Sequence, residues 1–346
     1  IVALCQFLPG PASSQVGIAV GITRAGLLGG MAAWLGFTLP SAVVLIVFAY
    51  GVTTSGDISG AGWIHGLKVV SVAVVVLALW GMARNLCPDR ARATIAILSV
   101  VAIVALQSAM AQILVIVVGG FLGWLLLAHV HQDYISRHQF PIGRRLAIGS
   151  LVLFGLLLVG LPILRHIVPS QPIAVFDSFF RAGSLVFGGG HVVLPLLRTE
   201  VVPPEWVTQE QFISGYGVTQ AIPGPLFTFA GYLGAVMDGF PSRWMGATLS
   251  LVAIFSPSFL LVVGVLPFWD RLRLVVGFQR ALAGINAAVV GVLLAALYDP
   301  VWTSAIKSTE DFALGLGAFG LLAFWKWPPW LVVLLVAVGG EGLSRL

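Results

Sequence analysis

Long apolar stretches separated by short polar ones set the pattern of this sequence. The runs 69–82, 113–128 and 281–297 are almost continuously apolar. A transmembrane helix needs about 20 mostly apolar residues, whereas a membrane β-barrel shows alternating segments of about ten. The pattern therefore predicts an all-α fold, that of a polytopic helical membrane protein.

The individual spans follow from where the apolar runs begin and end. In the first half we expect a broken segment and then five membrane spans, at residues 1–22, 27–52, 66–83, 93–108, 111–128 and 146–164. The composition agrees, because 59% of the 346 residues are hydrophobic and 9% are charged. So few charges do not cover the surface of a water-soluble globule.

A Pro-Gly-Pro turn interrupts an apolar run twice, at residues 9–11 and 223–225. A glutamine precedes the first proline of each turn by three positions, Gln6 and Gln220. An α-helix does not continue through this turn, because proline lacks a backbone donor and its ring clashes with the preceding turn. Backbone groups released at membrane depth are tolerated only where protein or a water-filled cavity satisfies them. Two such breaks at matching positions are typical of a transporter's substrate site.

The two turns also fit an internal repeat. Three landmarks recur at almost the same offset: Pro9 and Pro223 lie 214 residues apart, Pro40 and Pro257 lie 217 apart, and the runs 71–75 and 286–290 lie 215 apart. An offset shared by three landmarks indicates an internal duplication. We therefore predict two homologous repeats with broken helices, residues 1–165 and 166–346.

Positive charges favour one side of the membrane. Arg24, the loop 84–92 and the loop 137–145 share a side if the first segment returns to its own side. By the positive-inside rule that side is cytoplasmic. Five crossings between the halves then place the second repeat upside down, so we expect an inverted repeat. Whether residues 170–222 hold hairpins or a full crossing stays open.

A second unusual feature is the run Phe187–His191, three glycines followed by a histidine. We expect position 189 or 190 to need a positive φ and the missing side chain, so that backbone donors reach a ligand. A half-helix starting at His191 would point free N–H groups, the positive end of its dipole, at this gap. Such helix ends bind oxyanions, and a protonated imidazole would add charge to them.

The segments after the two Pro-Gly-Pro turns begin helices in the same way, with hydroxyl and amide side chains beside them. The predicted substrate-binding residues are Gln6, Pro9, Gly10, Pro11, Ser13, Ser14, Arg181, Gly188, Gly189, Gly190, His191, Gln220, Pro223, Gly224, Pro225 and Thr228. Arg181 is included because it is a cation in a membrane-like stretch. We predict no catalytic residue, metal or cofactor.

Plainer interpretations stay open for several of these residues. The triple glycine could serve tight helix packing, and the Pro-Gly-Pro turns could be structural kinks. Most arginines outside the spans are assigned to topology. The polar cluster of His129, His131, Asp133 and His138 has irregular spacing, so we predict no metal site there.

Three classes of function compete, a carrier, a membrane enzyme and a pore. A pore would repeat one polar face along several spans, which this sequence does not do. A secondary anion carrier accounts for the repeat, the broken helices and the donor-rich turns together. A membrane-embedded enzyme would need a nucleophile with a base, paired carboxylates or a metal triad inside a span. That enzyme, or a structural subunit, is the alternative from another class. The triple glycine lacks the lysine and serine of a phosphate loop, so we expect an ion gradient or exchange to supply the energy.

Three long motifs resemble those of the CHR chromate ion transporter family in its long two-domain form. They are ALCQFLPGPASSQVG at 3–17, FGGGHVVLP at 187–195 and GYGVTQAIPGPLFT at 215–228. The resemblance also takes in LCPDR at 86–90 and NAAVVG at 286–291, so it covers essentially the whole chain. It implies a secondary transporter in the bacterial inner membrane that exports chromate, with sulfate or another tetrahedral oxyanion as the alternative substrate.

The resemblance also sets expectations for the start of the chain and for partners. Family members carry a glycine-rich segment like Phe187–His191 ahead of the first Pro-Gly-Pro turn. Eight residues precede Pro9, so we expect an upstream segment that this sequence does not include. The expected partners are chromate or a similar oxyanion such as sulfate and the lipid bilayer. A homodimer is left open and no nucleic acid is expected, since no basic stripe with interleaved aromatic residues exists.

Overall fold

The computed structural model describes residues 4–5, 8–54, 61–106, 108–127, 142–240, 242–272 and 274–345. Within these residues every regular element is a helix. Five helical stretches are long and apolar enough to cross a membrane, at residues 12–53, 62–86, 144–167, 243–268 and 276–305. The predicted all-α membrane fold is therefore confirmed, and the chain is a multi-pass membrane protein.

The long helices are α2 (Ala12–Thr54), α3 (Gly62–Leu86), α4 (Arg90–Leu106), α5 (Ala109–Leu126), α6 (Arg144–Ile167), α11 (Arg243–Val265) and α13 (Val276–Ala296). The shorter helices are α7 (Gln171–Leu185), α8 (Val193–Val201), α9 (Gln209–Ala221), α10 (Phe229–Val236), α12 (Trp269–Leu272), α14 (Thr303–Ala305), α15 (Thr309–Ala323) and α16 (Pro329–Leu343). Four tighter or wider turns join them, η1 (Gly190–Val192), η2 (Leu226–Thr228), η3 (Leu266–Phe268) and η4 (Leu297–Trp302). The predicted spans from residue 66 to residue 164 agree with α3 to α6 to within a few residues.

Helix α2 contains a sharp reversal ahead of the predicted span 27–52. Ala25 and Gly26 have non-helical backbone angles, and Gly26 has a φ of 64°. The backbones of Gly21 and Gly29 touch, so a Cβ on either would overlap the carbonyl oxygen of the other. Residues 12–24 therefore fold back on the rest of α2 as a hairpin. Helix α10 folds onto α11 through a matching contact of two glycines, at positions 234 and 246.

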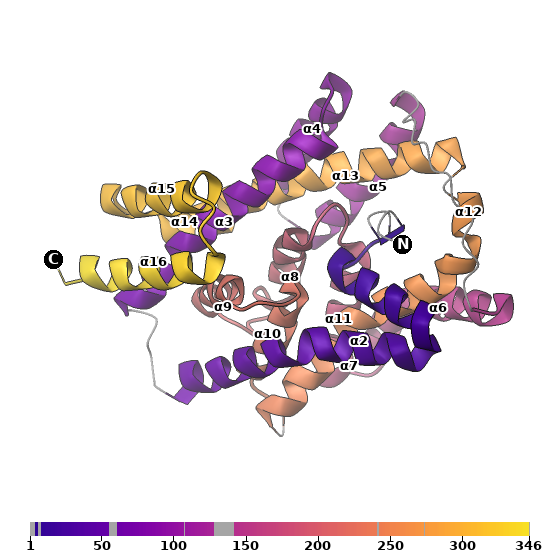
Figure 1. The fold of residues 1–346 in the computed structure, drawn as a ribbon, viewed down its shortest axis with the longest axis horizontal. Helices are drawn as coiled ribbons and strands as arrows, with labels where there is room; N and C mark the ends of the chain where they lie inside the picture. The colour runs from indigo at the N-terminus through magenta and orange to yellow at the C-terminus, as the bar shows by residue number, and fades with distance from the viewer. Residues whose placement is uncertain are drawn as a thin grey trace.

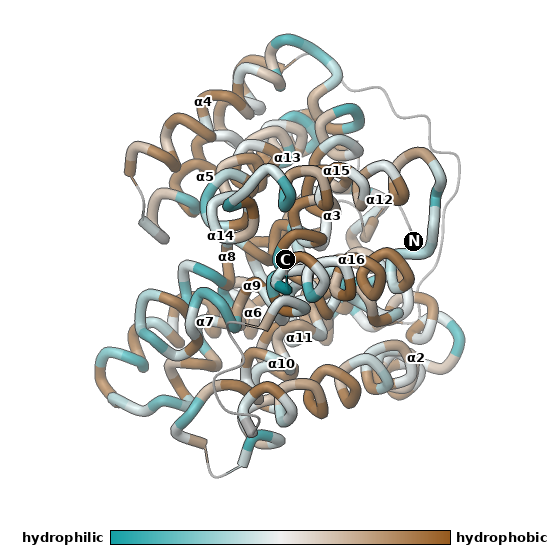
Figure 2. Tube along the Cα trace, turned by 90° about the vertical axis from the view of Figure 1, so that its left-hand side faces the viewer, coloured by the Kyte–Doolittle hydropathy of each residue, from teal (hydrophilic) through white to brown (hydrophobic). Residues whose placement is uncertain are grey.

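The outer helices turn apolar side chains outward. On α6, Leu156, Val159 and Ile163 are 66%, 63% and 54% exposed. Figure 2 shows apolar residues along the outside of α2 and α4 as well. In water such a surface would be unfavourable, whereas in a bilayer it contacts lipid chains.

Helices α3 and α13 each pack along a pair of helices that is distant in the sequence. Helix α3 lies along α15 and α16, and α13 lies along α4 and α5 (Figure 1). Gly66 of α3 lies against the backbone of Val336 in α16. Gly284 of α13 lies against Gly119 and Gly123 of α5. Small residues let helix backbones approach closely where lipid removes the usual hydrophobic drive.

Two short helical hairpins fill the middle of the molecule (Figure 1). Helix α7 leads through η1 into α8, and α9 leads through η2 into α10. The longest of these helices, α7, has 15 residues. At 1.5 Å per residue it extends about 23 Å, which is less than the hydrocarbon core of roughly 30 Å. Residues 170–222 thus form hairpins, with their turns inside the fold.

Candidate functional site

The triple glycine makes the sharp turn between α7 and α8. Gly188 has a φ of 74°, in the left-handed region that favours glycine. Gly189 is extended, with φ and ψ of 160° and 154°, and Gly190 already opens the turn η1. Neither Gly189 nor Gly190 has a φ in the left-handed region, so the expectation for position 189 or 190 is wrong. The chain reverses one residue earlier, directly after the extended end of α7, so that the next two residues lead into α8.

The first Pro-Gly-Pro turn docks onto the end of α7. The Gly10 N–H donates to the Val186 carbonyl oxygen over 2.7 Å. Gly10 has a φ of 124°, and a Cβ there would lie 2.6 Å from Gln15 Nε2 and 2.7 Å from Ser258 Oγ. Glycine is therefore required here by both backbone conformation and space.

Gln15 holds this first turn in place. Its Nε2 donates to the Pro9 carbonyl oxygen over 2.6 Å, and its backbone N–H donates to the Pro11 carbonyl oxygen over 2.9 Å. Its Oε1 and the neighbouring Ser14 Oγ are buried without a hydrogen-bond partner among the described residues. The start of α2 thus retains unsatisfied polar atoms beside the turn.

The second Pro-Gly-Pro turn approaches the triple glycine from the other side. Gly224 has a φ of 151° and leaves no room for a Cβ beside the hydroxyl of Ser41. Leu226, directly after the turn, is the nearest neighbour of a Cβ built on Gly190, at 3.7 Å. The triple-glycine segment, from Val186 onward, therefore lies between the two Pro-Gly-Pro turns.

Two cavities meet at His191. The first cavity has a volume of about 700 Å³, and its wall includes Gly10, Met82, Asn85, Gly188, Gly189 and Asn286. The second cavity has a volume of about 470 Å³, and its wall includes Thr219, Gln220, Pro223, Gly224, Leu322 and Trp330. His191, Leu77 and Ala78 line both. Among the described lining residues there is no Asp, Glu, Lys or Arg, so the available donors are neutral.

His191 is held by a buried tyrosine of α9. Its Nδ1 lies 2.6 Å from the hydroxyl oxygen of Tyr216, whose side chain is fully buried. If the hydroxyl donates to Nδ1, both groups are satisfied and the ring proton lies on Nε2. The reverse arrangement leaves the phenol hydrogen without an acceptor among the described residues. We therefore assign a neutral ring whose Nε2–H is a donor, in place of the charged ring expected from the sequence.

Gln220 ends α9 at the wall of the second cavity. Its Nε2 is buried and has no hydrogen-bond partner in the described part of the chain. An unpaired buried donor costs free energy, and an oxyanion oxygen in the cavity would supply the missing partner. The corresponding Gln6 lies outside the described residues.

The remaining residues predicted around the turns have other positions. Thr228 Oγ1 donates to the Pro225 carbonyl oxygen over 2.8 Å and thereby closes the second turn. Ser13 is exposed. The polar cluster at 129–138 lies outside the described residues.

Arg181 belongs to a separate ion-pair cluster that joins α7 to α8. Its guanidinium donates twice to Asp177, over 3.0 Å each, and twice to Glu200, over 2.7 and 2.8 Å. Asp177 is 1% exposed and lies 3.4 Å from Arg165 as well. Two carboxylates occupy Arg181, and it lines neither cavity. We leave it out of the proposed site for this reason.

Two asparagines in the wall of the first cavity were not predicted. Asn286 Oδ1 lies 3.6 Å from where a Cβ on Gly188 would be, and Asn85 lies at the end of α3. Amide side chains offer neutral donors at modest desolvation cost. The sequence could have indicated Asn286, because it is a polar residue inside an apolar run. The sequence could not have indicated Asn85, because this residue lies next to Arg84 at the end of a span, where polar residues are expected.

The fold and the site together define a class, a helical multi-pass membrane protein whose broken helices meet at uncharged internal cavities. The family model for chromate transporters matches residues 1–124 and 173–341. The chain belongs to the chromate transporter family. Proteins of this family are transporters and not enzymes.

Similar proteins cover most of the chain. The chromate transport protein of Pseudomonas aeruginosa is 29% identical over 357 residues, 99% of this chain and 81% of its own length. A probable chromate transport protein of Synechococcus elongatus is 24% identical over 97% of this chain and 83% of its own length. An uncharacterized transporter of Bacillus subtilis, YwrA, is 27% identical over 49% of this chain and 95% of its own length. No solved structure matches the chain significantly.

Proposed function

We propose that this chain is a secondary transporter that exports chromate across the bacterial inner membrane. The observation that carries the proposal is the meeting of three chain breaks at His191, between two cavities without charged walls. Free N–H groups at broken helices, amide side chains and a neutral imidazole are suited to a tetrahedral oxyanion. The full-length relatives named for chromate transport support chromate as the substrate. Sulfate is the second candidate, because it presents the same arrangement of oxygens.

We further propose that residues 1–165 and 166–346 are inverted repeats. Ser41, which follows Pro40 in α2, lies against Gly224 of the second half. Ser258, which follows Pro257 in α11, lies beside Gly10 of the first half. Each of these serines thus lies beside the Pro-Gly-Pro turn of the other half. The packing follows the same exchange, because α3 lies along α15 and α16 and α13 lies along α4 and α5. The half-length transporter YwrA supports the division into two units.

The proposed direction rests on where the first cavity reaches the surface. Asn85 lines this cavity and is exposed at the end of α3, directly before the loop that leads to Arg90 and Arg92 in the first turn of α4. The positive-inside rule assigns that loop to the cytoplasm. An exporter collects its substrate there, so this conformation corresponds to the loading state.

Flux measurements on inverted membrane vesicles test the proposal. Labelled chromate should accumulate in vesicles that carry the chain, and a pH gradient and a membrane potential imposed separately will identify the driving force. Labelled sulfate, measured in the same way, ranks the two substrates. Chromate entry no greater than that into vesicles without the chain would contradict the proposal.

Gln220→Leu tests the site within the same assay. A hydrogen bond to a charged acceptor is worth about 1.5–3 kcal/mol, so chromate affinity should fall roughly tenfold or more while protein abundance stays normal. Gln171→Leu is the matched control, because Gln171 donates to the Asp238 carbonyl oxygen away from both cavities. Equal transport by the two variants would mean that Gln220 supports the second Pro-Gly-Pro turn and does not bind the substrate.

A further inference from the structure

A third cavity, here called the outer cavity, lies on the far side of α8 from the triple glycine. Its volume is about 540 Å³, and it is enclosed by the ends of α4 and α13, the start of α5, α8 and η4. Helix α13 lines the first cavity with Asn286 and the outer cavity with Ala295 and Ala296. The two cavities are therefore offset along α13 by about 13 Å. The outer cavity lies on the side that we assign to the periplasm.

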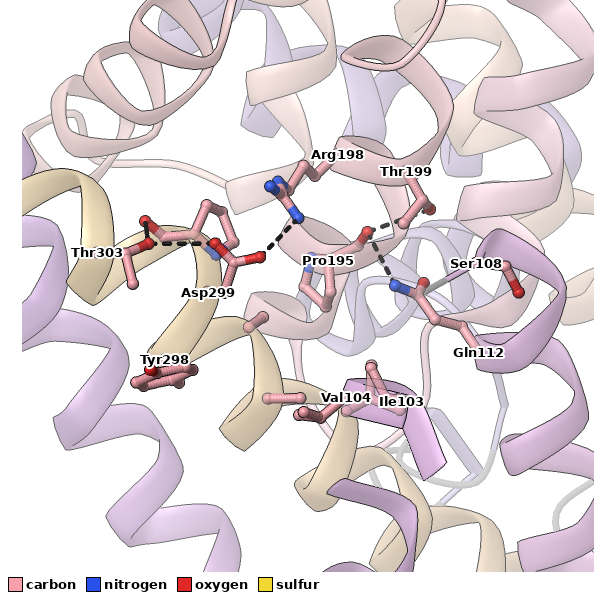
Figure 3. A pocket seen from close by; sticks show the side chains of 14 residues that line it. Ile103, Val104, Ser108, Gln112, Pro195, Arg198, Thr199, Tyr298, Asp299 and Thr303 are labelled. Carbon is pink, nitrogen blue, oxygen red and sulfur yellow. Dashed lines mark hydrogen bonds and ion pairs between the residues drawn. The ribbon is translucent and has the colours of Figure 1, made fainter. Parts of the chain in front are cut away.

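Arg198 of α8 gives the outer cavity a cation with spare donors (Figure 3). Its Nε donates to Gln209 over 3.1 Å, and its other nitrogens approach Asp299 only to 3.5 Å. Asp299 is itself more than half exposed. A guanidinium has five N–H groups, so most of those on Arg198 remain available. Arg181, by contrast, makes four short hydrogen bonds to two carboxylates.

Gln112 supplies an independent sign that a ligand belongs here. It lies in the first turn of α5 and is 6% exposed, and its Oε1 has no hydrogen-bond partner among the described residues. Its Nε2 reaches the Pro195 carbonyl oxygen only at 3.5 Å (Figure 3). The same turn begins at Ser108, which also lines the cavity and whose hydroxyl accepts from the Ala111 N–H. A buried amide oxygen of this kind requires a donor.

These groups together select the charge state of the ligand. Arg198 and the start of α5 favour an anion, whereas Asp299 opposes a dianion. Gln112 Oε1 needs a hydrogen that a fully deprotonated oxyanion does not carry. A singly protonated tetrahedral oxyanion meets all three conditions, since it offers oxygens to the guanidinium and its own hydroxyl to the amide. Tyr298, also in the wall, is mostly exposed.

We propose that the outer cavity is a second oxyanion site, in which a singly protonated tetrahedral oxyanion replaces Asp299 on Arg198 and donates its hydroxyl to Gln112. The inference rests on the proposed function and deepens it, because it adds a step that separates chromate from sulfate. Hydrogen chromate is present near neutral pH, whereas hydrogen sulfate is not. The first and second cavities bind the dianion of chromate or of sulfate. The outer cavity admits only the oxyanion that takes up a proton.

Equilibrium binding of labelled chromate to the purified full chain in lipid nanodiscs tests this. Wild type should bind two chromates, and Arg198→Gln should bind one. Asp299→Asn should raise the affinity of the outer cavity for chromate roughly tenfold, because it removes the carboxylate that competes for Arg198. Such a gain also shows that the variant is folded, because a misfolded protein would lose affinity. Arg345→Gln, at an arginine that is 77% exposed and paired with Glu341, is the control and should bind as wild type does.

The pH dependence of binding and competition by sulfate test whether the outer cavity binds the singly protonated oxyanion. Binding at the outer site should strengthen as the pH falls from 8 to 6, and Gln112→Leu should weaken that dependence. Sulfate should displace one of the two chromates. One bound chromate in both wild type and Arg198→Gln, or no gain from Asp299→Asn, would overturn the inference while leaving transport intact. Failure of the proposed function would instead appear as absent chromate uptake by vesicles.

Discussion

Gly188 is the residue on which the turn between α7 and α8 depends. Its φ of 74° is strained for any residue with a Cβ, and that Cβ would lie 3.1 Å from Leu86 Cδ1. Gly188→Ala should strain the backbone by on the order of 1–2 kcal/mol and displace the backbone N–H groups of the triple-glycine turn. Chromate affinity should therefore fall about tenfold. Gly190→Ala is the matched control, since its nearest neighbour would be 3.7 Å away. Chromate uptake at equal abundance measures both, and a larger loss from Gly190→Ala would rule out this account.

Tyr216 contacts His191 and is proposed to act on the substrate through it, as a positioning residue. Tyr216→Phe removes the hydrogen bond to Nδ1, so the ring loses its fixed tautomer and part of its orientation. We expect chromate affinity to fall several-fold with normal protein abundance. Tyr232→Phe makes the same change at a neighbouring buried tyrosine that donates to the Gln211 carbonyl oxygen over 3.1 Å. Equal affinities of the two variants for labelled chromate would show that His191 needs no such support.

The contacts between elements depend on glycine backbones as much as on side chains. Gly284 of α13 lies so close to α5 that a Cβ would overlap the Gly119 carbonyl oxygen and lie 2.6 Å from Gly123 Cα. Backbone atoms cannot move aside as a flexible side chain can, so the two helices must separate. The contact between α5 and α13 therefore leaves little room for larger residues.

Gly284→Ala should consequently destabilise the fold by roughly 1–3 kcal/mol, the usual cost of overpacking. Gly155→Ala in α6 is the control, because a Cβ at Gly155 would meet nothing within 4 Å. Thermal unfolding of the purified protein in detergent measures the difference. A midpoint for Gly284→Ala equal to that of Gly155→Ala would mean that α5 and α13 are free to separate without cost.

The whole molecule is proposed to have its arginine-rich loops in the cytoplasm. A cysteine placed at Ser242 should react with an impermeant thiol reagent on intact cells, and one at Asp89 only after lysis, because both positions are exposed and the proposed orientation puts them on opposite sides. Native Cys87 gives little background, since burial raises the pKa of its thiol to about 11 and the thiol stays protonated at neutral pH. Its labelling after lysis should increase as the pH rises. The reverse labelling pattern for the two introduced cysteines would invert the proposed orientation.

The features that the sequence alone determined are those that the bilayer imposes locally. Apolar length predicted the spans, because a helix must cross about 30 Å of hydrocarbon. Proline and glycine predicted the breaks at residues 9–11, 188–190 and 223–225, because their effect on the backbone does not depend on distant contacts. The long motifs built on these breaks were sufficient to indicate the family.

Only the tertiary structure decided which side chains meet at those breaks. Asn85 and Asn286 face the first cavity, Tyr216 orients His191, and Arg181 is occupied by Asp177 and Glu200. Apolar helices of similar length can pack in many ways, and hydropathy does not distinguish among them. The crossed contacts of glycine and serine select one packing, and the donors, ion pairs and cavities follow from that choice.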